Sequence, residues 1–294
     1  MSIFKKIKKM QLGLHLFFLI SCVTFIVPFL ILVGISFSRE QDVWHYGYRL
    51  IPKNFDLTAY KWVFRNPGQI LQAYKVTATF SVVEMILQTF VTTILAYPLS
   101  QPEFKMKKVV TMIMFIIMNF SAGLVPTYLW HTQFLHLGNT IWIYIIPNLV
   151  NVWNVFMIRT FFKGIPYELS EAAVVDGAGE LRIYASIIIP LSKPALATIS
   201  LMTFLNAWNN WYTSMIYITR DELISLQYFL QRILEDLDLI QTNEQAANML
   251  TYEAIPSETI RMAMAVVVVG PALFVFPFFQ KYFVKGLTIG SIKG

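Results

Sequence analysis

The sequence predicts an all-α membrane protein, a single transmembrane domain over residues 1–294 with six transmembrane helices. Apolar residues make up 56% of the chain and charged residues 14%, whereas soluble globular chains carry about 25% charged residues. Six stretches also reach the roughly 20 apolar residues that a helix needs to cross a bilayer. Backbone groups in lipid must be bonded within their own segment, which favours helices over an open sheet.

The six expected spans share long apolar runs, and the charged residues inside them are Glu84 and Arg159. They cover residues 12–36, 76–99, 109–130, 141–162, 194–219 and 262–280. The first run follows a basic N-terminus, as in a signal peptide. It exceeds the about 7–15 residues of a signal-peptide core, and no cleavage motif follows it. We therefore expect a retained helix.

Lysine and arginine placement predicts the orientation, because cytoplasmic connections are enriched in these residues. The connection 131–140 has no Lys or Arg. Basic residues instead precede the first span, separate the second from the third and the fourth from the fifth, and follow the sixth: Lys5, Lys6, Lys8, Lys9, Lys105, Lys107, Lys108, Lys163, Arg182, Lys193, Lys281, Lys285 and Lys293. Both termini are therefore expected in the cytoplasm, with segments 37–75 and 220–258 outside it.

Residues 164–190, here called the coupling segment, connect the fourth and fifth spans and are expected to begin with a short helix. Gly164 and Pro166 open it, since proline fits the first helical turn. Gly177 closes it, as a C-terminal residue in the left-handed conformation. The expected rod is roughly 16 Å long at 1.5 Å per residue.

The side chains of this helix leave two interpretations open. Glu168 and Glu171 favour its N-terminal half through the helix dipole, while Ala172 and Ala173 keep one surface flat. Such a rod fits a groove on a soluble partner. The alternative is an amphipathic helix lying on the bilayer surface.

Spacing within the segment favours the first interpretation. A Glu-Ala-Ala triplet is followed by Gly, Ile and Pro, at Glu171, Ala172, Ala173, Gly177, Ile187 and Pro190. This pattern resembles the signature of the inner-membrane permease family of binding-protein-dependent ABC importers. The flanking GIPYELSEAA and DGAG resemble its carbohydrate branch. PKNFDLTAYKWVF, FLNAWNNWY and the C-terminal GLTIGSIKG extend the resemblance over nearly the whole chain, although residues 212–216 lack a proline common in the family.

The resemblance implies that the helix seats in a cleft of an ATPase subunit. The implied ATPase-coupling residues are Glu168, Glu171, Ala172, Ala173, Asp176 and Gly177. It further implies a bacterial cell-membrane location and these partners: a homologous permease subunit, two ATP-binding-cassette ATPase subunits, an extracellular solute-binding lipoprotein, a carbohydrate and membrane lipid. We expect no cofactor on this chain, with ATP and Mg²⁺ used by the ATPases, because a phosphate-binding loop needs a Gly-Lys pair and the sequence has none.

Polar side chains inside spans are expected to face the bundle interior or water. A sugar pathway needs amide and carboxylate partners with aromatic faces. The candidate pathway residues are Glu84, Gln88, Asn148, Asn151, Asn206, Trp208, Asn209 and Asn210. Asparagines equally suit contacts that hold membrane helices together, and aromatic residues near a span end suit the interfacial belt.

Two other classes of function compete with the permease. A self-contained secondary transporter of a polar solute would want inverted repeats and ion-binding carboxylates, for which Glu84 alone is thin support. A membrane enzyme would want metal or catalytic spacings, and no H-E-x-x-H pattern occurs. We therefore expect no catalytic residue and no metal site. The net charge of +6 is mostly the enrichment of Lys and Arg on the cytoplasmic side, and the sequence has no basic patch. We therefore expect no nucleic-acid partner.

Overall fold

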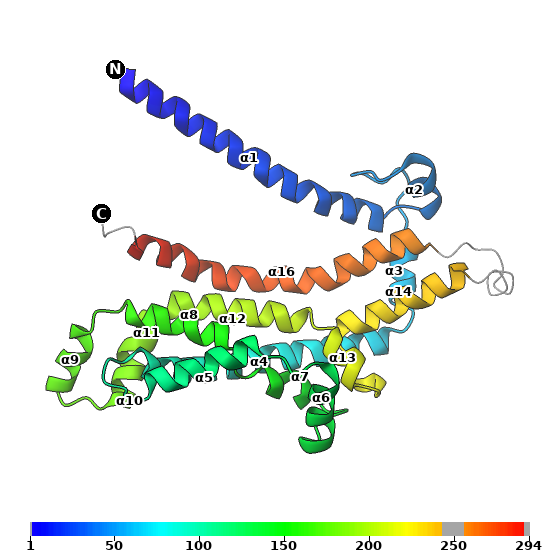
Figure 1. Cartoon of the computed structure of the whole chain (residues 1–294). Helices are drawn as coiled ribbons and strands as arrows, with labels where there is room; N and C mark the ends of the chain where they lie inside the picture. The colour runs from blue at the N-terminus through cyan, green and yellow to red at the C-terminus, as the bar shows by residue number, and fades with distance from the viewer. Residues whose placement is uncertain (1, 243–255, 291–294) are drawn as a thin grey trace. The chain divides into compact units, whose positions relative to one another are not determined.

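A computed structural model describes residues 2–242 and 256–290, and Figure 1 shows its helices. Within those residues the regular structure is helical, apart from an isolated β-bridge between Ser38 and Phe55. This confirms the all-α class. Contacts group the chain into two compact units, residues 1–67 with 230–271 and residues 68–229 with 272–294. The two units are described separately.

Unit 1 contains the N-terminal helix and parts of two later helices. Its complete helices are α1 (Ser2–Ser36), α2 (Glu40–Tyr46) and α3 (Thr58–Val63). It also includes the part of α14 (Leu226–Thr242) from residue 230 on and the part of α16 (Ser257–Gly290) up to residue 271. Within α1, the stretch Leu12–Ser36 is long and apolar enough to span a membrane. Apolar side chains of α1 are exposed, as for Phe25 at 77%, which suits a lipid surface.

A carboxylate from α2 caps the start of α16. Glu40 accepts hydrogen bonds from the backbone N–H groups of Glu258 and Thr259 at 3.0 and 2.9 Å, and from the Thr259 hydroxyl at 2.8 Å. The first N–H groups of a helix lack intrahelical partners, so this contact satisfies them. The Tyr48 hydroxyl donates to Glu258 at 3.2 Å, and the negative charge of Glu258 raises the pKa of Tyr48. The connection after α1 is thereby fixed to α16.

Unit 2 holds the remaining helices. They are α4 (Pro67–Ser100), α5 (Lys107–Asn119), α6 (Leu124–Leu129), α7 (Trp142–Ile145), α8 (Val152–Lys163), α9 (Glu168–Val175), α10 (Glu180–Ile183), α11 (Ile189–Leu191), α12 (Lys193–Trp208) and α13 (Tyr212–Tyr217). Short π turns at Trp130–Phe134 and Tyr184–Ile188, and 3-10 turns at Ile146–Asn148 and Asp221–Leu223, complete the unit.

The core of unit 2 is an apolar cluster shared by α4, α5, α8, α12 and the coupling segment. It includes Leu99, Met114, Val155, Ile183 and Ile199, all buried. Figure 1 shows α9 and α10 at one end of this unit and α6 and α13 at the other. The coupling segment therefore ends the bundle on one side.

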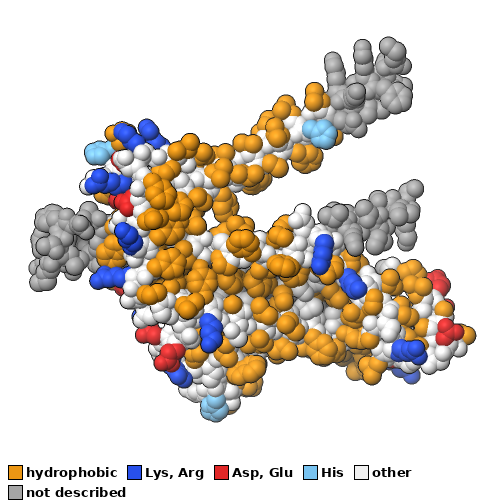
Figure 2. Space-filling model, turned by 180° about the vertical axis from the view of Figure 1, so that it is seen from behind, with side chains coloured by type: hydrophobic (Ala, Val, Ile, Leu, Met, Phe, Trp, Pro, Cys, Tyr) orange, Lys and Arg blue, Asp and Glu red, His pale blue; other side chains and the backbone are white. Residues whose placement is uncertain are grey.

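Three helices are each long and apolar enough to cross a membrane, Leu12–Ser36, Pro67–Ser100 and Ser257–Tyr282. Three bent pairs also pass if each pair counts as one span: Lys107–Asn119 with Leu124–Phe134 (113°), Trp142–Asn148 with Val152–Lys163 (49°), and Glu180–Leu191 with Lys193–Trp208 (78°). The described chain therefore has three to six candidate spans. On the face in Figure 2, hydrophobic side chains cover most of the length of the helices, and charged ones lie mainly near helix ends.

The structure does not have continuous helices over the third, fourth and fifth expected spans, because each of these helices is broken. The third breaks at residues 120–123, where Gly123 adopts a φ of +86°. The fourth breaks around Pro147, and Asn151 caps α8 by accepting from the N–H of Asn154 at 3.1 Å. The fifth ends at Trp208, and Asn210 accepts from the N–H of Thr213 at 3.1 Å at the start of α13. Local side-chain bonds to the backbone thus compete with the helix.

The segment 220–258, which is expected outside the cytoplasm, contains an amphipathic helix. It is α14, and Leu226, Phe229, Leu230 and Leu237 are buried along it. Residues 243–255 of that segment lie outside the described residues.

Candidate functional site

A pocket of about 260 Å³ in unit 2 is lined mainly by polar side chains from α4, the connection between α7 and α8, and the end of α12. It brings together most of the residues predicted to form a substrate pathway, namely Glu84, Gln88, Asn148, Asn151, Asn206 and Asn210. We call it the polar pocket. Glu84 and Gln88 share one wall because residues four apart lie on one face of a helix.

Gln88 is the centre of the hydrogen bonds behind this pocket. Its Nε2 donates to the backbone carbonyl of Asn148 at 2.6 Å. Its Oε1 accepts from Nδ2 of Asn154 at 3.0 Å and from the Thr203 hydroxyl. Asn154 and Thr203 were not among the predicted residues. Each lies three positions from a predicted asparagine, Asn151 or Asn206, and this helical spacing was the available signal.

Glu84 is 4% exposed and is the one charged residue among those that line the polar pocket. Its Oε2 has no hydrogen-bond partner within the described residues. Within the described residues no Lys, Arg or His side chain forms an ion pair with Glu84. A buried oxygen without a donor is unfavourable, and a charged residue in a span marks a candidate pathway. A polar cargo could supply the donor.

Trp208 and Asn209 lie outside the polar pocket. Trp208 is 4% exposed, and its ring packs near Phe204 and Tyr74 with centroids 5.7 and 6.4 Å apart. The Oδ1 of Asn209 accepts from Nε2 of Gln227 at 3.0 Å. The polar pocket therefore offers amides, a hydroxyl and a carboxyl to a solute, without the predicted aromatic face of Trp208.

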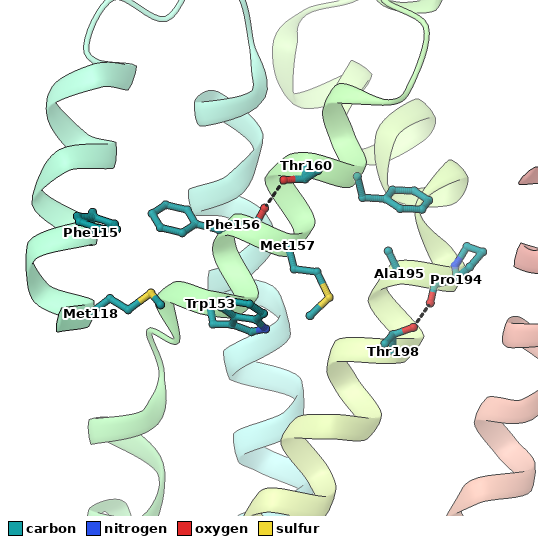
Figure 3. Close-up of a pocket in the computed structure, with 10 residues that line it drawn as sticks. Phe115, Met118, Trp153, Phe156, Met157, Thr160, Pro194, Ala195 and Thr198 are labelled. Atoms are coloured by element: carbon teal, nitrogen blue, oxygen red, sulfur yellow. Dashed lines mark hydrogen bonds between the residues drawn. The ribbon is translucent and has the colours of Figure 1, made fainter.

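A larger pocket, about 910 Å³, lies between α5, α8 and α12 and is apolar (Figure 3). Phe115, Trp153 and Met157 are among the side chains that face it. The hydroxyls of Thr160 and Thr198 donate to carbonyls of their own helices at 2.8 and 3.0 Å. Because these donors are already used, the pocket suits hydrocarbon and does not suit a sugar.

Helix α9 ends with a backbone motif that explains two of the predicted coupling residues. Gly177 has a φ of +81°, and its N–H donates to the carbonyl of Val174 at 2.9 Å. The N–H of Ala178 donates to the carbonyl of Ala173 at 2.8 Å. This pair of bonds is a Schellman motif, which favours glycine at the left-handed position. The predicted helix end at Gly177 is confirmed. The helix itself begins at Glu168, two residues after Pro166.

The surface of the coupling segment is acidic and apolar together. Glu168, Glu171, Ala172, Asp176 and Gly177 are exposed, while Ala173 is half-buried against the core cluster. Large apolar side chains are exposed beside them, Val174, Val175 and Leu181, and sequence reasoning did not single these out. Their signal was apolar residues directly beside acidic ones, at Val175–Asp176 and Glu180–Leu181.

Hydrogen bonds tie the coupling segment to the end of α4 and the loop after it. The Tyr167 hydroxyl donates to Oε1 of Glu103 at 2.5 Å, and this bond raises the pKa of Tyr167 to about 12. The Tyr97 hydroxyl donates to Oε2 of Glu180 at 2.6 Å.

Arg159 of α8 donates from Nε to the carbonyl of Leu99 at 3.0 Å. This is a favourable place for a cation, because Leu99 lies at the C-terminus of α4.

The family model for binding-protein-dependent transport system inner membrane components matches residues 70–289, which include the polar pocket and the coupling segment. The chain belongs to this family. Protein LplC of Bacillus subtilis is 35% identical over 269 residues, covering 92% of this chain and 90% of that protein. The polygalacturonan/rhamnogalacturonan transport system permease protein YtcP of the same species is 32% identical over 284 residues, covering 96% of both.

A solved structure agrees with these relatives. A chain of a bacterial ABC transporter involved in import of the acidic polysaccharide alginate has a TM-score of 0.78 and 28% identity, over 94% of this chain and 97% of that one. The matches favour a permease subunit of an ABC importer over a self-contained transporter.

Proposed function

We propose that this chain forms half of the translocation pathway of an ABC importer and receives movement from partner ATPases through α9. The observation that carries the proposal is the exposed surface of α9. Glu171 and Val175 face outward there, and within the described residues the side chain of Glu171 makes no hydrogen bond or ion pair. Exposed apolar and charged side chains together suit a protein partner.

The proposed membrane arrangement treats residues 1–294 as one permease domain with six spans. The bent pairs Lys107–Asn119 with Leu124–Phe134 and Trp142–Asn148 with Val152–Lys163 each count as one span, and α12 with α13 forms the fifth. Breaks within membrane segments are tolerated where protein or a water-filled cavity satisfies the backbone. Both termini and the coupling segment face the cytoplasm, following the lysine and arginine placement. Segments 37–75 and 220–258 face outward, toward a solute-binding lipoprotein.

The proposed assembly has a second, homologous permease and two ATPase subunits, which bind ATP and Mg²⁺. The apolar pocket between α5, α8 and α12 suits lipid chains or apolar side chains. The polar pocket suits the solute, since its amides and Glu84 match sugar hydroxyls. An oligosaccharide is the proposed cargo, because relatives are named for polygalacturonan, rhamnogalacturonan and arabinooligosaccharides.

Replacing Glu171 with Lys tests the proposed docking of α9. Tagging this chain in its own cell and purifying the importer measures how much ATPase remains attached. We expect a loss of about tenfold or more, since removing one partner of an interfacial charge pair weakens binding by about 2–5 kcal/mol. Glu222→Lys is the matched control, because Glu222 is 71% exposed and lies outside the coupling segment.

Uptake of galacturonan, alginate and arabinan oligomers by the same cells should fall in parallel with ATPase attachment. Equal ATPase recovery in the Glu171→Lys and Glu222→Lys variants, with uptake in Glu171→Lys equal to that of the unchanged chain, would contradict the proposed function.

A further inference from the structure

Two tyrosine–glutamate hydrogen bonds hold the coupling segment at two separate points. Tyr167 lies directly before α9 and bonds to Glu103, in the loop after α4. Tyr97 lies near the end of α4 and bonds to Glu180, the first residue of α10. Both bonds have a carboxylate acceptor and are short, at 2.5 and 2.6 Å, as expected for charge-assisted hydrogen bonds. The segment is therefore tied before α9 and after it to one region of the bundle.

Packing and hydrogen bonds together hold the segment against α4. The hydroxyls of Thr93 and Tyr184 lie 2.7 Å apart, and the rings of Tyr97 and Tyr184 have centroids 5.2 Å apart. A pocket of about 490 Å³ separates α10 from the end of α4 on one side, with Tyr97, Glu103 and Glu180 in its wall. Packing against the core cluster involves other residues, such as Ile183. Across the pocket, the Tyr97–Glu180 bond is a direct link between the two helices.

Helix α4 then connects these bonds with the polar pocket. Residues 84–97 contain no glycine or proline, so this part of the helix has no residue that favours a kink. Thirteen steps at 1.5 Å place Tyr97 about 20 Å from Glu84 along the axis. Glu84 and Gln88, which line the polar pocket, are thus on the same unbroken helix as Tyr97.

We propose that Tyr97 and Tyr167 are positioning residues whose hydrogen bonds carry movement of the coupling segment along α4 to the polar pocket. The inference rests on the proposed function, because the movement originates in the ATPases. It adds a route and four of the side chains that connect the segment to that route. A rigid helix tied to a moving element transmits displacement, as packed elements do in other switching proteins.

The test follows a reporter cysteine in the polar pocket of the assembled importer. Val150 lines the pocket and is 50% exposed, so Val150→Cys is the reporter, in a Cys22→Ser background that removes the exposed native thiol. The rate of maleimide labelling is measured with and without trapping by Mg-ATP and vanadate. Retained nucleotide and co-purified ATPase are measured in the same samples.

Tyr97→Phe combined with Tyr167→Phe removes both hydroxyls and keeps both rings. We expect the nucleotide-dependent change in labelling rate to shrink about fivefold, as for a typical coupling between sites. Nucleotide trapping and ATPase recovery should stay unchanged. Tyr128→Phe, a change of the same kind in α6 at the other end of unit 2, should leave the labelling response intact.

Glu103→Gln with Glu180→Gln keeps an oxygen acceptor for each tyrosine and should retain most of the labelling response. Glu103→Ala with Glu180→Ala should lose the response as the phenylalanine variants do. If the double phenylalanine variant does not assemble, Tyr167→Phe alone carries the test, with a loss of about twofold expected.

A full labelling response in the phenylalanine variants overturns the route and leaves the proposed function standing. An equal loss of the labelling response in the glutamine variants also overturns the route, because those variants keep the hydrogen bonds that the route depends on. If the parent reporter shows no nucleotide-dependent change, the proposed function and the route both fail.

Discussion

The polar pocket and helix α9 both belong to unit 2, yet their side chains are satisfied in opposite ways. In the pocket, Gln88 is bonded to Asn148, Asn154 and Thr203, so these four polar groups support one another, and Oε2 of Glu84 is the exception. On α9, Glu171 and Val175 face outward. A substitution of Gln88 in the pocket should therefore lower the stability of the fold as well as change any contact with the cargo. A substitution on the exposed surface of α9 should mainly weaken binding of a partner.

The largest expected effect on stability comes from Gln88→Leu. This substitution removes the partner of the Asn154 amide and the Thr203 hydroxyl, which then stay buried without hydrogen bonds. We expect the free energy of unfolding to fall by about 2–3 kcal/mol, measured by thermal unfolding in detergent. Gln72→Leu is the control on the same helix, because Gln72 bonds to the carbonyl of Glu222 near the surface. Equal melting of the two variants would remove the contrast between pocket and surface.

An intermediate effect is expected from Gly177→Val. Nothing lies within 4 Å of an added Cβ, so the change acts through the φ of +81° alone. Left-handed backbone is unfavourable by about 1–2 kcal/mol for a residue with a side chain, which should fray the end of α9. ATPase recovery should fall, with little change in the melting of the bundle. Gly179→Val is matched to it, since Gly179 has an ordinary φ of −76° and equal free space. Similar ATPase recovery from both variants would count against the role of the Schellman motif.

The smallest effect on the isolated chain is expected from Val175→Ser. Val175 is 87% exposed, so the free energy of unfolding should change by less than about 0.5 kcal/mol. ATPase attachment should nevertheless weaken if this side chain is buried by the partner. The same substitution at Val155, which is fully buried, should instead lower the melting temperature. Wild-type ATPase recovery from Val175→Ser would show that the apolar surface of α9 is not part of the docking contact.

Sequence patterns predicted the features that depend on near neighbours in the chain. The first span depends on apolar composition alone, and the structure has a helix over the expected residues 12–36 that ends at Ser36. The end of α9 depends on one glycine with positive φ, which the sequence marks directly. Glu84 and Gln88 share a pocket wall because they are one helical turn apart.

Features that depend on distant residues or on local backbone competition were not predictable in this way. Apolar composition measures affinity for lipid and does not report the break before Gly123 or the end of α12 at Trp208. The Tyr167–Glu103 bond joins residues 64 apart. No periodicity indicates such a pair, and none indicated that Trp208 would pack beside Phe204 and Tyr74 rather than line the pocket.

The cap that Glu40 places on α16 also sets an order of events during synthesis. The carboxylate and the N–H groups that it accepts from are 218 and 219 residues apart. At a ribosomal rate of about 5–20 residues per second, roughly ten to forty seconds separate their emergence. Until then Glu40 has no helix start to bind, so unit 1 closes only after most of unit 2 has been translated. A nascent chain truncated before residue 257 would therefore leave the Glu40 carboxylate without the N–H groups that it accepts from.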